Sequence, residues 1–387
     1  MAKIVYLNFW DDMNEGRKRK CYLSCVNKAH YILDILKENE SVPIEIVSCS
    51  GSAEKKGSKG CAKQIDDNVS FRQFRTFGCA NKAVRLLEII YIKLCLIFYF
   101  LFSVNKNDTV IVYHSLFYCS ILKYLKLLKN FKMVLELEEL YSDVIGNSKK
   151  KKSELKLCHV ADAFIFPTIM LNDVANKVNK PYCVAHGTYK VEDERKVSFD
   201  DSKIHVVYAG TLDMRKGGAL AAASAAEFLD ERYVVHILGF GPEKSVAHIK
   251  QIVKDINKKT KATVIYEGVL QGEAYIEFIQ KCHIGLSVQN PDAEFNGTSF
   301  PSKILSYMSN GLRVVSVDIP AITGSAVNGY LYYYQKQTPE NIAGAIKSID
   351  MNDEYDGRYV VRQLNERFGK ELKELLKGVG YAQKTIE

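Results

Sequence analysis

Arg215 and Lys216 stand side by side just after a turn of small residues, in the segment VVYAGTLDMRKGG at residues 206–218. The strand-like VVYA leads into Gly210 and Thr211, which allow a tight turn with exposed backbone N–H groups, and a helix-like run follows. Two cations beside exposed amides favour an anion through both charge and hydrogen bonds. The segment therefore predicts a binding site for a phosphate or diphosphate group.

A second segment of this kind, FPSKILSYMSNG, covers residues 300–311. Pro301 is typical of the first turn of a helix, and Lys303 follows near the end where the helix dipole is positive. Between the two segments, Gly239 and Gly241 in LGFGPE resemble half of a dinucleotide fingerprint. The third glycine is missing, so the pattern is weak support for a dinucleotide.

The first half of the chain holds candidate groups for sugar chemistry. His114 ends the apolar run VIVYHS, which predicts a buried strand with His114 at its carboxyl end. A hydrogen-bonded core histidine is the competing interpretation. Glu136, Glu138 and Glu139 follow the next strand-like run, and alternation places Glu136 and Glu138 on one face and Glu139 on the other. These carboxylates could bind acceptor hydroxyls or form a solvated strand end.

Five runs in the second half resemble, in the same order, the nucleotide-sugar domain of two-domain retaining glycosyltransferases, especially glycosyltransferase family 4. They are the GTLDMRKGG turn, HILGFGPE, VIYEGVL, IGLSVQ and FPSKILSYMSNGLRVVSVD. The resemblance implies a GT-B fold and a nucleotide-sugar donor, with UDP the most frequent nucleotide in the family. The donor contacts that it implies are Gly210, Thr211, Gly239, Gly241, Gly268, Val269, Thr298, Ser299, Lys303 and Ser306.

The resemblance also implies catalytic and acceptor-side roles. Arg215 and Lys216 would stabilise the departing diphosphate, and His114 would contact the hydroxyls of the donor sugar. Gly16, in the loop after the first strand, loosely matches a glycine loop that lies beneath the sugar in the family. With Glu139 it is the candidate on the acceptor side.

One departure concerns two glutamates, separated by seven residues, that the family usually carries near this second helix. Thr298 and Ser306 occupy the corresponding positions. A hydroxyl can hydrogen-bond a ribose, but without the strength of a charge-assisted bond. Asp292 or Glu294, in the preceding loop, could supply a carboxylate instead.

The length of 387 residues predicts two domains. Strand-like and helix-like runs alternate along the chain, which predicts an α/β fold with two Rossmann-like parallel-sheet domains. We expect an acceptor-side domain at residues 1–188, a hinge at 189–202 and a nucleotide-sugar domain at 203–354. In the resembled GT-B fold the domains face each other across the cleft that holds the active site. The terminal helix, here within residues 355–387, packs back on the first domain in that fold.

The net charge of +8 arises within residues 1–200, which hold 31 Lys and Arg against 23 Asp and Glu. A basic first domain predicts an acidic partner, such as an anionic membrane surface or a lipid-linked diphosphate. Nucleic acid is not expected as a partner. The densest basic run, residues 149–152, has no interleaved aromatic side chains and is typical of a solvated loop.

Residues 86–102, LLEIIYIKLCLIFYFLF, form the most apolar run of the chain. The run is short for a bilayer span and contains Glu88 and Lys93. It predicts either a core helix of the first domain or a helix that lies in the membrane interface. In the second case, the four basic residues between positions 72 and 85 would meet anionic headgroups.

The ten cysteines form no CxxC pair, which predicts reduced thiols rather than disulfides or a zinc site. The strand-like MAKIVYLNF leaves no room for a signal peptide, so we expect a cytoplasmic protein that is peripheral on the inner face of the cell membrane. The sequence holds no Asp-x-Asp pair. We therefore expect no metal or other cofactor, with basic side chains stabilising the diphosphate.

These patterns together predict a glycosyltransferase. It would move a sugar, with retained configuration, from a UDP-sugar to a hydroxyl acceptor. The acceptor expected from the basic, apolar first domain is a lipid-linked oligosaccharide in surface polysaccharide synthesis. Two alternatives stay open: a nucleotide-sugar epimerase of the same architecture, and a non-catalytic subunit of a transferase complex that binds a nucleotide sugar.

Overall fold

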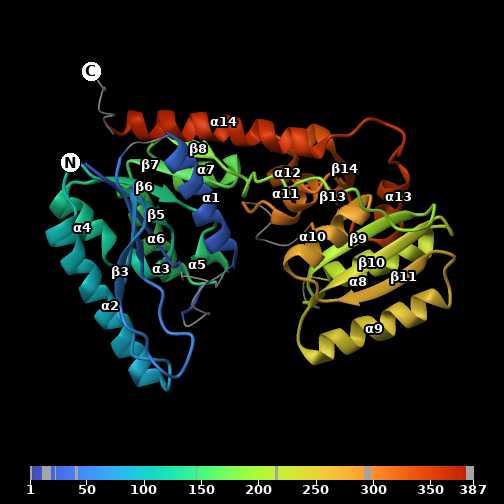
Figure 1. Ribbon diagram of the computed structural model, residues 1–387, viewed down its shortest axis with the longest axis horizontal. Coiled ribbons are helices and arrows are strands. Elements are labelled where there is room, and N and C mark those ends of the chain that lie inside the picture. The colour runs from blue at the N-terminus through green and yellow to red at the C-terminus, as the bar shows by residue number, and fades with distance from the viewer. Residues whose placement is uncertain are drawn as a thin grey trace. The chain divides into compact units, whose positions relative to one another are not determined.

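The computed structural model describes residues 2–10, 19–21, 23–39, 42–144, 146–213, 217–291 and 298–380. The chain divides into two compact units. Residues 1–188 and 367–387 form the first unit, and residues 189–366 form the second. Each unit is built around its own β-sheet (Figure 1).

The sheet of the first unit has eight strands in the order β3-β4-β2-β1-β5-β6-β7-β8. The strands are β1 (Ile4–Asn8), β2 (Ile44–Ser48), β3 (Cys61–Asp66), β4 (Val69–Gln73), β5 (Thr109–Tyr113), β6 (Lys132–Glu136), β7 (Ala163–Phe166) and β8 (Tyr182–Val184). Only the edge pair β3 and β4 is antiparallel among these described strands. The central strands β1, β2 and β5 are buried along their whole length, as expected of parallel strands covered on both faces.

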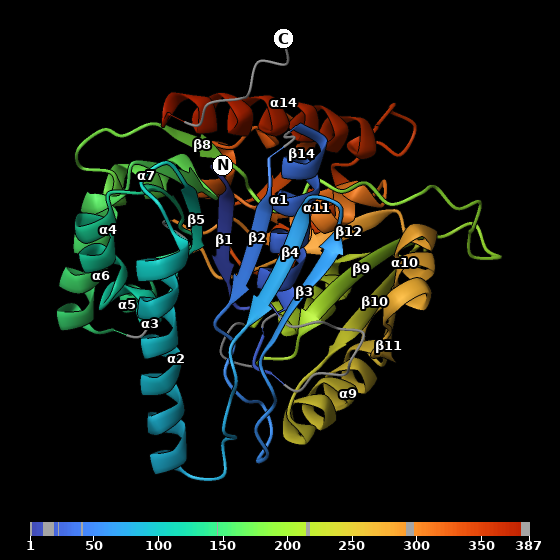
Figure 2. The ribbon, with the colours of Figure 1, turned by 60° about the vertical axis from the view of Figure 1, so that its left-hand side comes forward.

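Helices cover both faces of this sheet. They are α1 (Leu23–Asn39), α2 (Lys82–Ser103), α3 (Leu116–Cys119), α4 (Leu122–Lys129), α5 (Tyr141–Val144), α6 (Ser148–Val160) and α7 (Ile169–Ala175). On one face, Val5 and Val112 join Leu96 of α2, Leu125 of α4 and Leu157 of α6 in a single apolar cluster. Figures 1 and 2 show α1 on the opposite face.

The sheet of the second unit has six strands, all parallel, in the order β11-β10-β9-β12-β13-β14. The strands are β9 (Ile204–Thr211), β10 (Tyr233–Phe240), β11 (Thr263–Gly268), β12 (Ile284–Ser287), β13 (Arg313–Val317) and β14 (Leu331–Tyr334). Because the chain turns back across β9 to reach β12, the order reverses at β9. The carboxyl ends of parallel strands at such a reversal leave a crevice where ligands bind.

The second unit contains both α-helices and short 3₁₀ turns. They are α8 (Gly218–Ser224), η2 (Ala225–Phe228), α9 (Glu243–Asn257), α10 (Gly272–Lys281), α11 (Ser302–Ser309), α12 (Pro320–Thr323), η4 (Asn328–Tyr330) and α13 (Pro339–Lys347). The last helix, α14 (Gly357–Gly378), belongs to the first unit from Arg367 onward. There, the Phe368 ring stacks on Tyr31 of α1, with 5.9 Å between ring centroids.

The predicted α/β fold with two Rossmann-like parallel-sheet units is confirmed. Two details differ from the sequence-based expectation. The apolar run lies within a longer helix, α2, and the exposed antiparallel strand β3 was not predicted. Within the described residues, none of the ten cysteines forms a disulfide.

Candidate functional site

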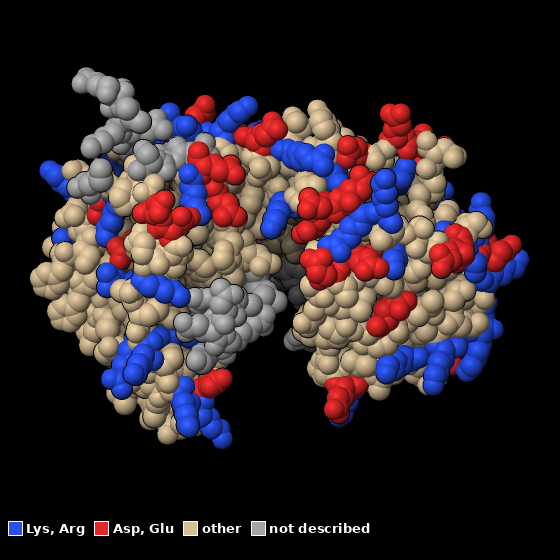
Figure 3. Space-filling model, in the orientation of Figure 1, with Lys and Arg blue, Asp and Glu red and all other residues tan. Residues whose placement is uncertain are grey.

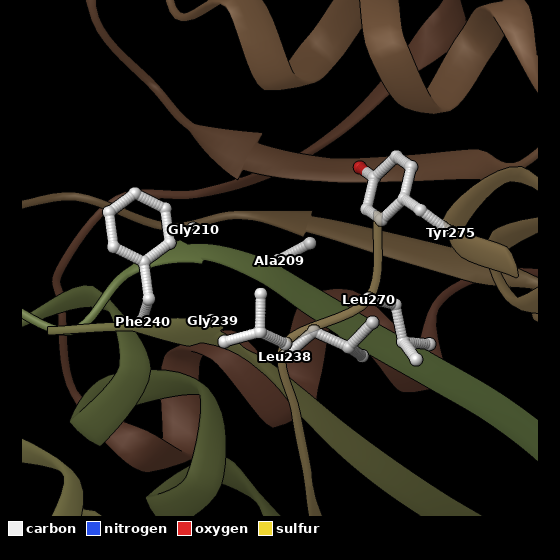
Figure 4. Close-up of a pocket in the computed structure, with 8 residues that line it drawn as sticks. Ala209, Gly210, Leu238, Gly239, Phe240, Leu270 and Tyr275 are labelled. Atoms are coloured by element: carbon white, nitrogen blue, oxygen red, sulfur yellow. The ribbon is translucent and has the colours of Figure 1, made fainter. Parts of the chain in front are cut away.

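A pocket of about 200 Å³ lies at the carboxyl ends of β9 and β10 in the second unit (Figure 4). The two strands run in register to their ends, where Gly239 pairs with Gly210 and Phe240 pairs with Thr211. The pocket is lined by Ala209, Gly210, Leu238, Gly239, Phe240, Val269, Leu270 and Tyr275. Three of these, Gly210, Gly239 and Val269, are among the donor-binding residues predicted from the sequence.

Gly239 is required by the close approach of the two strands. Its φ of 153° lies in a region that side chains disfavour, and a Cβ there would meet the carbonyl oxygen of Gly210 at 1.9 Å. Gly241 is also tight, because a Cβ would lie 3.0 Å from both Cβ and the carbonyl oxygen of Leu212. The backbone is therefore bare at this edge of the pocket, and a ligand can approach it directly.

Lys303 brings a positive charge to the same edge. Helix α11 starts after Pro301, so Lys303 lies in its first turn, where the helix dipole favours anions. The Lys303 Cε lies 2.7 Å from where a Cβ of Gly210 would stand, and Nζ lies 5.1 Å from the centre of the Tyr208 ring. Gly210 and Lys303, which are both predicted to contact a diphosphate, thus lie within contact distance of each other.

Tyr307 of α11 holds the end of β9 in place. Its hydroxyl accepts a hydrogen bond from the backbone N–H of Ala209 at 2.9 Å, and the side chain is 1% exposed. Complete burial raises the pKa of Tyr307 well above its usual value, so the hydroxyl stays neutral. Gly285 of β12 leaves room for the ring, because a Cβ there would lie 2.3 Å from it.

Ser306 and Tyr275 meet at the other side of the pocket. The Ser306 hydroxyl hydrogen-bonds Tyr275, and this contact opposes the effect of burial, which raises the pKa of Tyr275. Figure 4 shows the Tyr275 and Phe240 rings at opposite ends of the pocket. The sequence analysis named neither aromatic residue as a site residue, because Phe240 is the variable position between the two glycines of LGFGPE and Tyr275 stands in no motif.

The lip of the pocket continues along β11. Gly268 has a φ of 79°, and the pairing of β10 with β11 shifts there, so that Leu238 faces Gly268. Val269, next in the chain, is 49% exposed. An exposed apolar side chain beside a bare backbone turn is suited to contact the flat face of a nucleotide base.

A chain of polar groups, with two buried histidines at its centre, leads to this side of the pocket. His205 contacts Asp201 at 2.8 Å and His236 at 2.8 Å, and His236 in turn contacts Glu267 at 2.7 Å. The Phe199 ring stacks on His205, with 3.8 Å between centroids. Burial lowers the pKa of His236, although the neighbouring Glu267 opposes the effect.

His114 follows β5 and extends its pairing with β6, because the backbone N–H of His114 donates to the carbonyl oxygen of Glu136 at 2.8 Å. The His114 side chain is buried, with 1% of it exposed. Its Nε2 lies 2.6 Å from Oε1 of Glu154, which also accepts hydrogen bonds from Tyr141 and Ser142. These contacts hold the pKa of Glu154 below its usual value despite burial. Within the described residues, His114 Nδ1 has no hydrogen-bond partner.

Glu136 is buried at the end of β6, where the sequence favoured a solvated strand end. It is 0% exposed, and it accepts a hydrogen bond from the Tyr6 hydroxyl at 2.6 Å. Burial raises the pKa of Glu136 to about 7, against the lowering effect of Lys28. Lys28 forms an ion pair with Glu138, and Glu139 is half-buried.

Several predicted residues lie outside the described part of the chain. They are Gly16, Arg215, Lys216, Asp292 and Glu294. Thr211 ends β9, and Thr298 and Ser299 precede α11. Among the described residues, no group of three or more His, Cys, Asp or Glu side chains is placed to hold a metal ion.

Comparison with known proteins adds two findings and one absence. Residues 203–351 match the family described as Glycosyl transferases group 1. That range covers the six strands of the second unit and the whole pocket. The sequence matches no curated protein.

Solved structures share the fold across the whole chain. A structure described as trehalose-6-phosphate from E. coli, bound with UDP-2-fluoro glucose, is 10% identical and has a TM-score of 0.68, covering 98% of this chain and 99% of that one. An α,α-trehalose-phosphate synthase (UDP-forming) from Burkholderia xenovorans, in complex with glucose-6-phosphate, is 11% identical with a TM-score of 0.66, covering 97% and 100%. A synthase from Burkholderia multivorans is 11% identical with a TM-score of 0.64, covering 98% and 96%.

The matched domain and the two-sheet fold define a glycosyltransferase of the GT-B type. At these identities the solved structures establish the fold alone.

Proposed function

We propose that the protein transfers a sugar from a UDP-sugar to a hydroxyl acceptor, with retained configuration and without a metal ion. The observation that carries the donor assignment is the pocket at the ends of β9 and β10, where Gly239 and Gly210 leave the backbone bare and Lys303 adds a cation. The UDP-2-fluoro glucose bound by the E. coli structure supports UDP as the nucleotide.

In this proposal the diphosphate lies between Gly210, Lys303, Arg215 and Lys216. Cations fixed at the phosphates stabilise the charge that develops on the leaving diphosphate, which is the task a metal ion would otherwise perform. Val269 would lie against the base, and Thr298, Ser299 and Ser306 would serve the ribose and sugar hydroxyls.

His114 is proposed as the residue of the first unit that contacts the donor sugar. Its Nε2 is held by Glu154, which fixes the orientation of the imidazole, and Nδ1 remains the nitrogen that could reach a ligand. Gly16 and Glu139 are proposed on the acceptor side. Because His114 is buried, contact with a sugar requires the surrounding residues to move aside.

The acceptor we propose is a lipid-linked oligosaccharide, met at the cytoplasmic face of the membrane. Support comes from the first unit, where the exposed side of α2 is apolar and basic. The Burkholderia xenovorans structure holds glucose-6-phosphate, so a soluble sugar phosphate is the acceptor to test against it.

The donor is tested by calorimetry of UDP with the full-length protein. Arg215→Ala and Lys216→Ala should each weaken UDP binding by roughly 1.5 to 3 kcal/mol, because each removes a charge-assisted contact. Lys258→Ala, at the exposed residue that follows α9, is the control and should bind UDP normally. If Arg215→Ala and Lys216→Ala both bind UDP like the parent, the phosphate assignment is wrong.

Catalysis is tested by transfer assays with the donor that stabilises the protein most in a thermal screen of UDP-sugars. Release of UDP that depends on an acceptor supports transfer, whereas epimerised donor without an acceptor indicates an epimerase. Binding without turnover indicates a non-catalytic subunit. His114→Ala should lower the transfer rate while leaving UDP affinity unchanged, because UDP lacks the sugar.

A further inference from the structure

Helix α2 carries two opposite ridges of apolar side chains. Leu86, Ile90, Leu94, Phe98 and Phe102 are between 47% and 81% exposed. Each of the first four stands two residues before a buried side chain, in the order Glu88, Ile92, Leu96 and Phe100. Positions two apart point about 200° from one another around a helix. The exposed ridge therefore lies on the side of α2 that faces away from the sheet.

Helix α4 widens this apolar area. Tyr124, Leu127 and Leu128 are spaced to share one face and are each at least 62% exposed. The two helices are joined, because Lys129 Nζ donates to the carbonyl oxygen of Leu101 at 2.7 Å. We name the exposed ridge of α2 and this face of α4 the α2-α4 surface. Neighbouring exposed apolar side chains that form a patch on a folded unit mark an interaction site.

The exposed charges of the stretch of chain that carries α2 and α4 are all basic. Between Asp67 and Glu136, a stretch that the structure describes completely, the chain holds two carboxylates, Glu88 and Asp108, which are 3% and 1% exposed. The basic residues of the same stretch are Arg72, Arg75, Lys82, Arg85, Lys93, Lys106, Lys123, Lys126, Lys129 and Lys132. Figure 3 shows the surface over α2, at the lower left of the view, as mainly tan and blue.

Helix α2 is long and apolar enough to cross a membrane, because it has 22 residues and an 18-residue window within it has a mean hydropathy of 2.1. Its inner ridge, however, is part of the folded unit. Glu88 accepts backbone hydrogen bonds from Ser52, Phe77 and Gly78, and Leu96 and Phe100 belong to the apolar cluster against the sheet. Crossing a bilayer would remove all of these contacts. Only the exposed ridge of α2 is therefore available to contact lipid while the unit stays folded.

We propose that the α2-α4 surface binds an anionic lipid bilayer, with α2 lying in the plane of the headgroups. The apolar ridge would enter the acyl boundary, and Arg75, Lys82, Arg85 and Lys106 would meet lipid phosphates. A bilayer supplies both features that the surface requires, a continuous apolar layer and a negative charge above it. The inference rests on the proposed function, because it assigns a surface to the membrane on which the lipid-linked acceptor would lie.

The experiment is sedimentation of the full-length protein with vesicles of phosphatidylcholine alone or mixed with phosphatidylglycerol. The parent should bind the anionic vesicles, bind neutral ones weakly, and lose binding as salt rises, since exposed charges are screened. Lys82→Glu with Arg85→Glu should reduce the partition coefficient roughly tenfold or more, from about fivefold for each basic residue near the surface. The matched control, Lys244→Glu with Lys254→Glu on α9, should bind like the parent.

The apolar contribution needs its own variant, Leu94→Gln with Phe98→Gln, and the control Phe228→Gln with Tyr359→Gln. The first should lose vesicle binding, and the control should keep it. Circular dichroism must show both folded, and Leu94→Gln alone is the milder substitute if the pair does not fold. Equal binding of parent and α2 variants to anionic vesicles overturns the proposal, as does parent binding that ignores lipid charge and salt.

Two further measurements distinguish membrane binding from contact between copies of the chain, and from the proposed transfer activity. If sedimentation velocity shows a dimer that the α2 variants convert to monomer, and vesicles are not bound, the surface is a contact between copies and the bilayer proposal is overturned. Transfer activity of the α2 variants toward detergent-solubilised acceptor should equal that of the parent. Vesicle binding without any transfer would contradict the proposed function and leave the docking surface supported.

Discussion

His205 Nδ1 and His236 Nε2 lie 2.8 Å apart, so the contact is a hydrogen bond only while one of the two nitrogens carries a proton. The chain from Asp201 to Glu267 contains three such contacts. Two neutral imidazoles supply two N–H groups for these three contacts. A third proton is therefore needed before all three contacts can be hydrogen bonds at once.

We predict that His236 contributes to acid sensitivity. Its folded pKa is lowered by burial, so the unfolded protein takes up the proton first as the pH falls below about 6.5. The stability that it contributes is thus present above that pH and is lost below it. His236→Asn keeps a donor for Glu267 and removes the ionisable ring, so the melting temperature should fall less steeply between pH 7 and pH 5.

The control for that measurement is His248→Asn on the exposed side of α9, which should leave the pH profile of the parent. His186 and His283, whose pKa values burial also lowers, keep some pH dependence in the variant. At pH 7 His236→Asn should cost roughly 1 to 3 kcal/mol, because His205 loses a buried partner. If the melting temperature of His236→Asn falls with pH as steeply as that of the parent, the prediction is wrong.

Glu136 should give the opposite pH dependence. Its folded pKa of about 7 lies above the unfolded value of 4.5, so its contribution to stability is complete below 4.5 and is lost as the pH rises through 7. Glu136→Gln stays neutral and keeps an acceptor for Tyr6. Denaturant unfolding should show a gain of up to about 3 kcal/mol at pH 8 and little gain at pH 4.5. Glu38→Gln, exposed on α1, should show no such difference.

Gly239→Ala should damage the donor site. A Cβ 1.9 Å from the Gly210 carbonyl forces the ends of β9 and β10 apart, at a positive φ that alanine disfavours. We expect a loss of roughly 1 to 3 kcal/mol in stability and at least a tenfold loss in UDP affinity by calorimetry. Gly344→Ala, exposed in α13 with no atom within 4 Å, should be neutral or slightly stabilising. Equal UDP affinity of the two variants would remove Gly239 from the site.

Lys303→Gln should separate phosphate binding from base binding. The change removes a cation beside Gly210, so UDP affinity should fall by roughly 1.5 to 3 kcal/mol, whereas uridine affinity should not change. Lys347→Gln, in the last turn of α13, provides the control. An equal loss for uridine and UDP would show that Lys303 supports the fold of the pocket rather than the phosphates.

The sequence predicted those parts of the fold that depend on local pattern. Uninterrupted apolar runs such as IVYL and VIVY marked strands buried on both faces, and glycine positions marked the turn edge of the pocket. Strand β3 escaped prediction because its six residues, CAKQID, are all exposed and show no apolar alternation. Strand β3 is held by its pairing with β4, and no pattern in the sequence predicts that pairing.

The supporting residues of the site could not be predicted, because they act across long separations. Tyr307 reaches Ala209 across 98 residues, and His205 meets His236 across 31. The burial of Glu136 was missed because a carboxylate after a strand is usually solvated. The sequence signal for a buried carboxylate here is an apolar strand that ends in two or more carboxylates, as in VLELEE.

Gly285 has a consequence for which substitutions the chain tolerates. It lies inside a β-strand, is not among the residues that line the donor pocket, and would be marked as replaceable by any rule based on distance from the ligand. Yet a single methyl group there would push the Tyr307 ring away and release the backbone of Ala209. A library that varies β12 should therefore find position 285 as intolerant as the pocket glycines, with the loss first visible as weaker nucleotide binding.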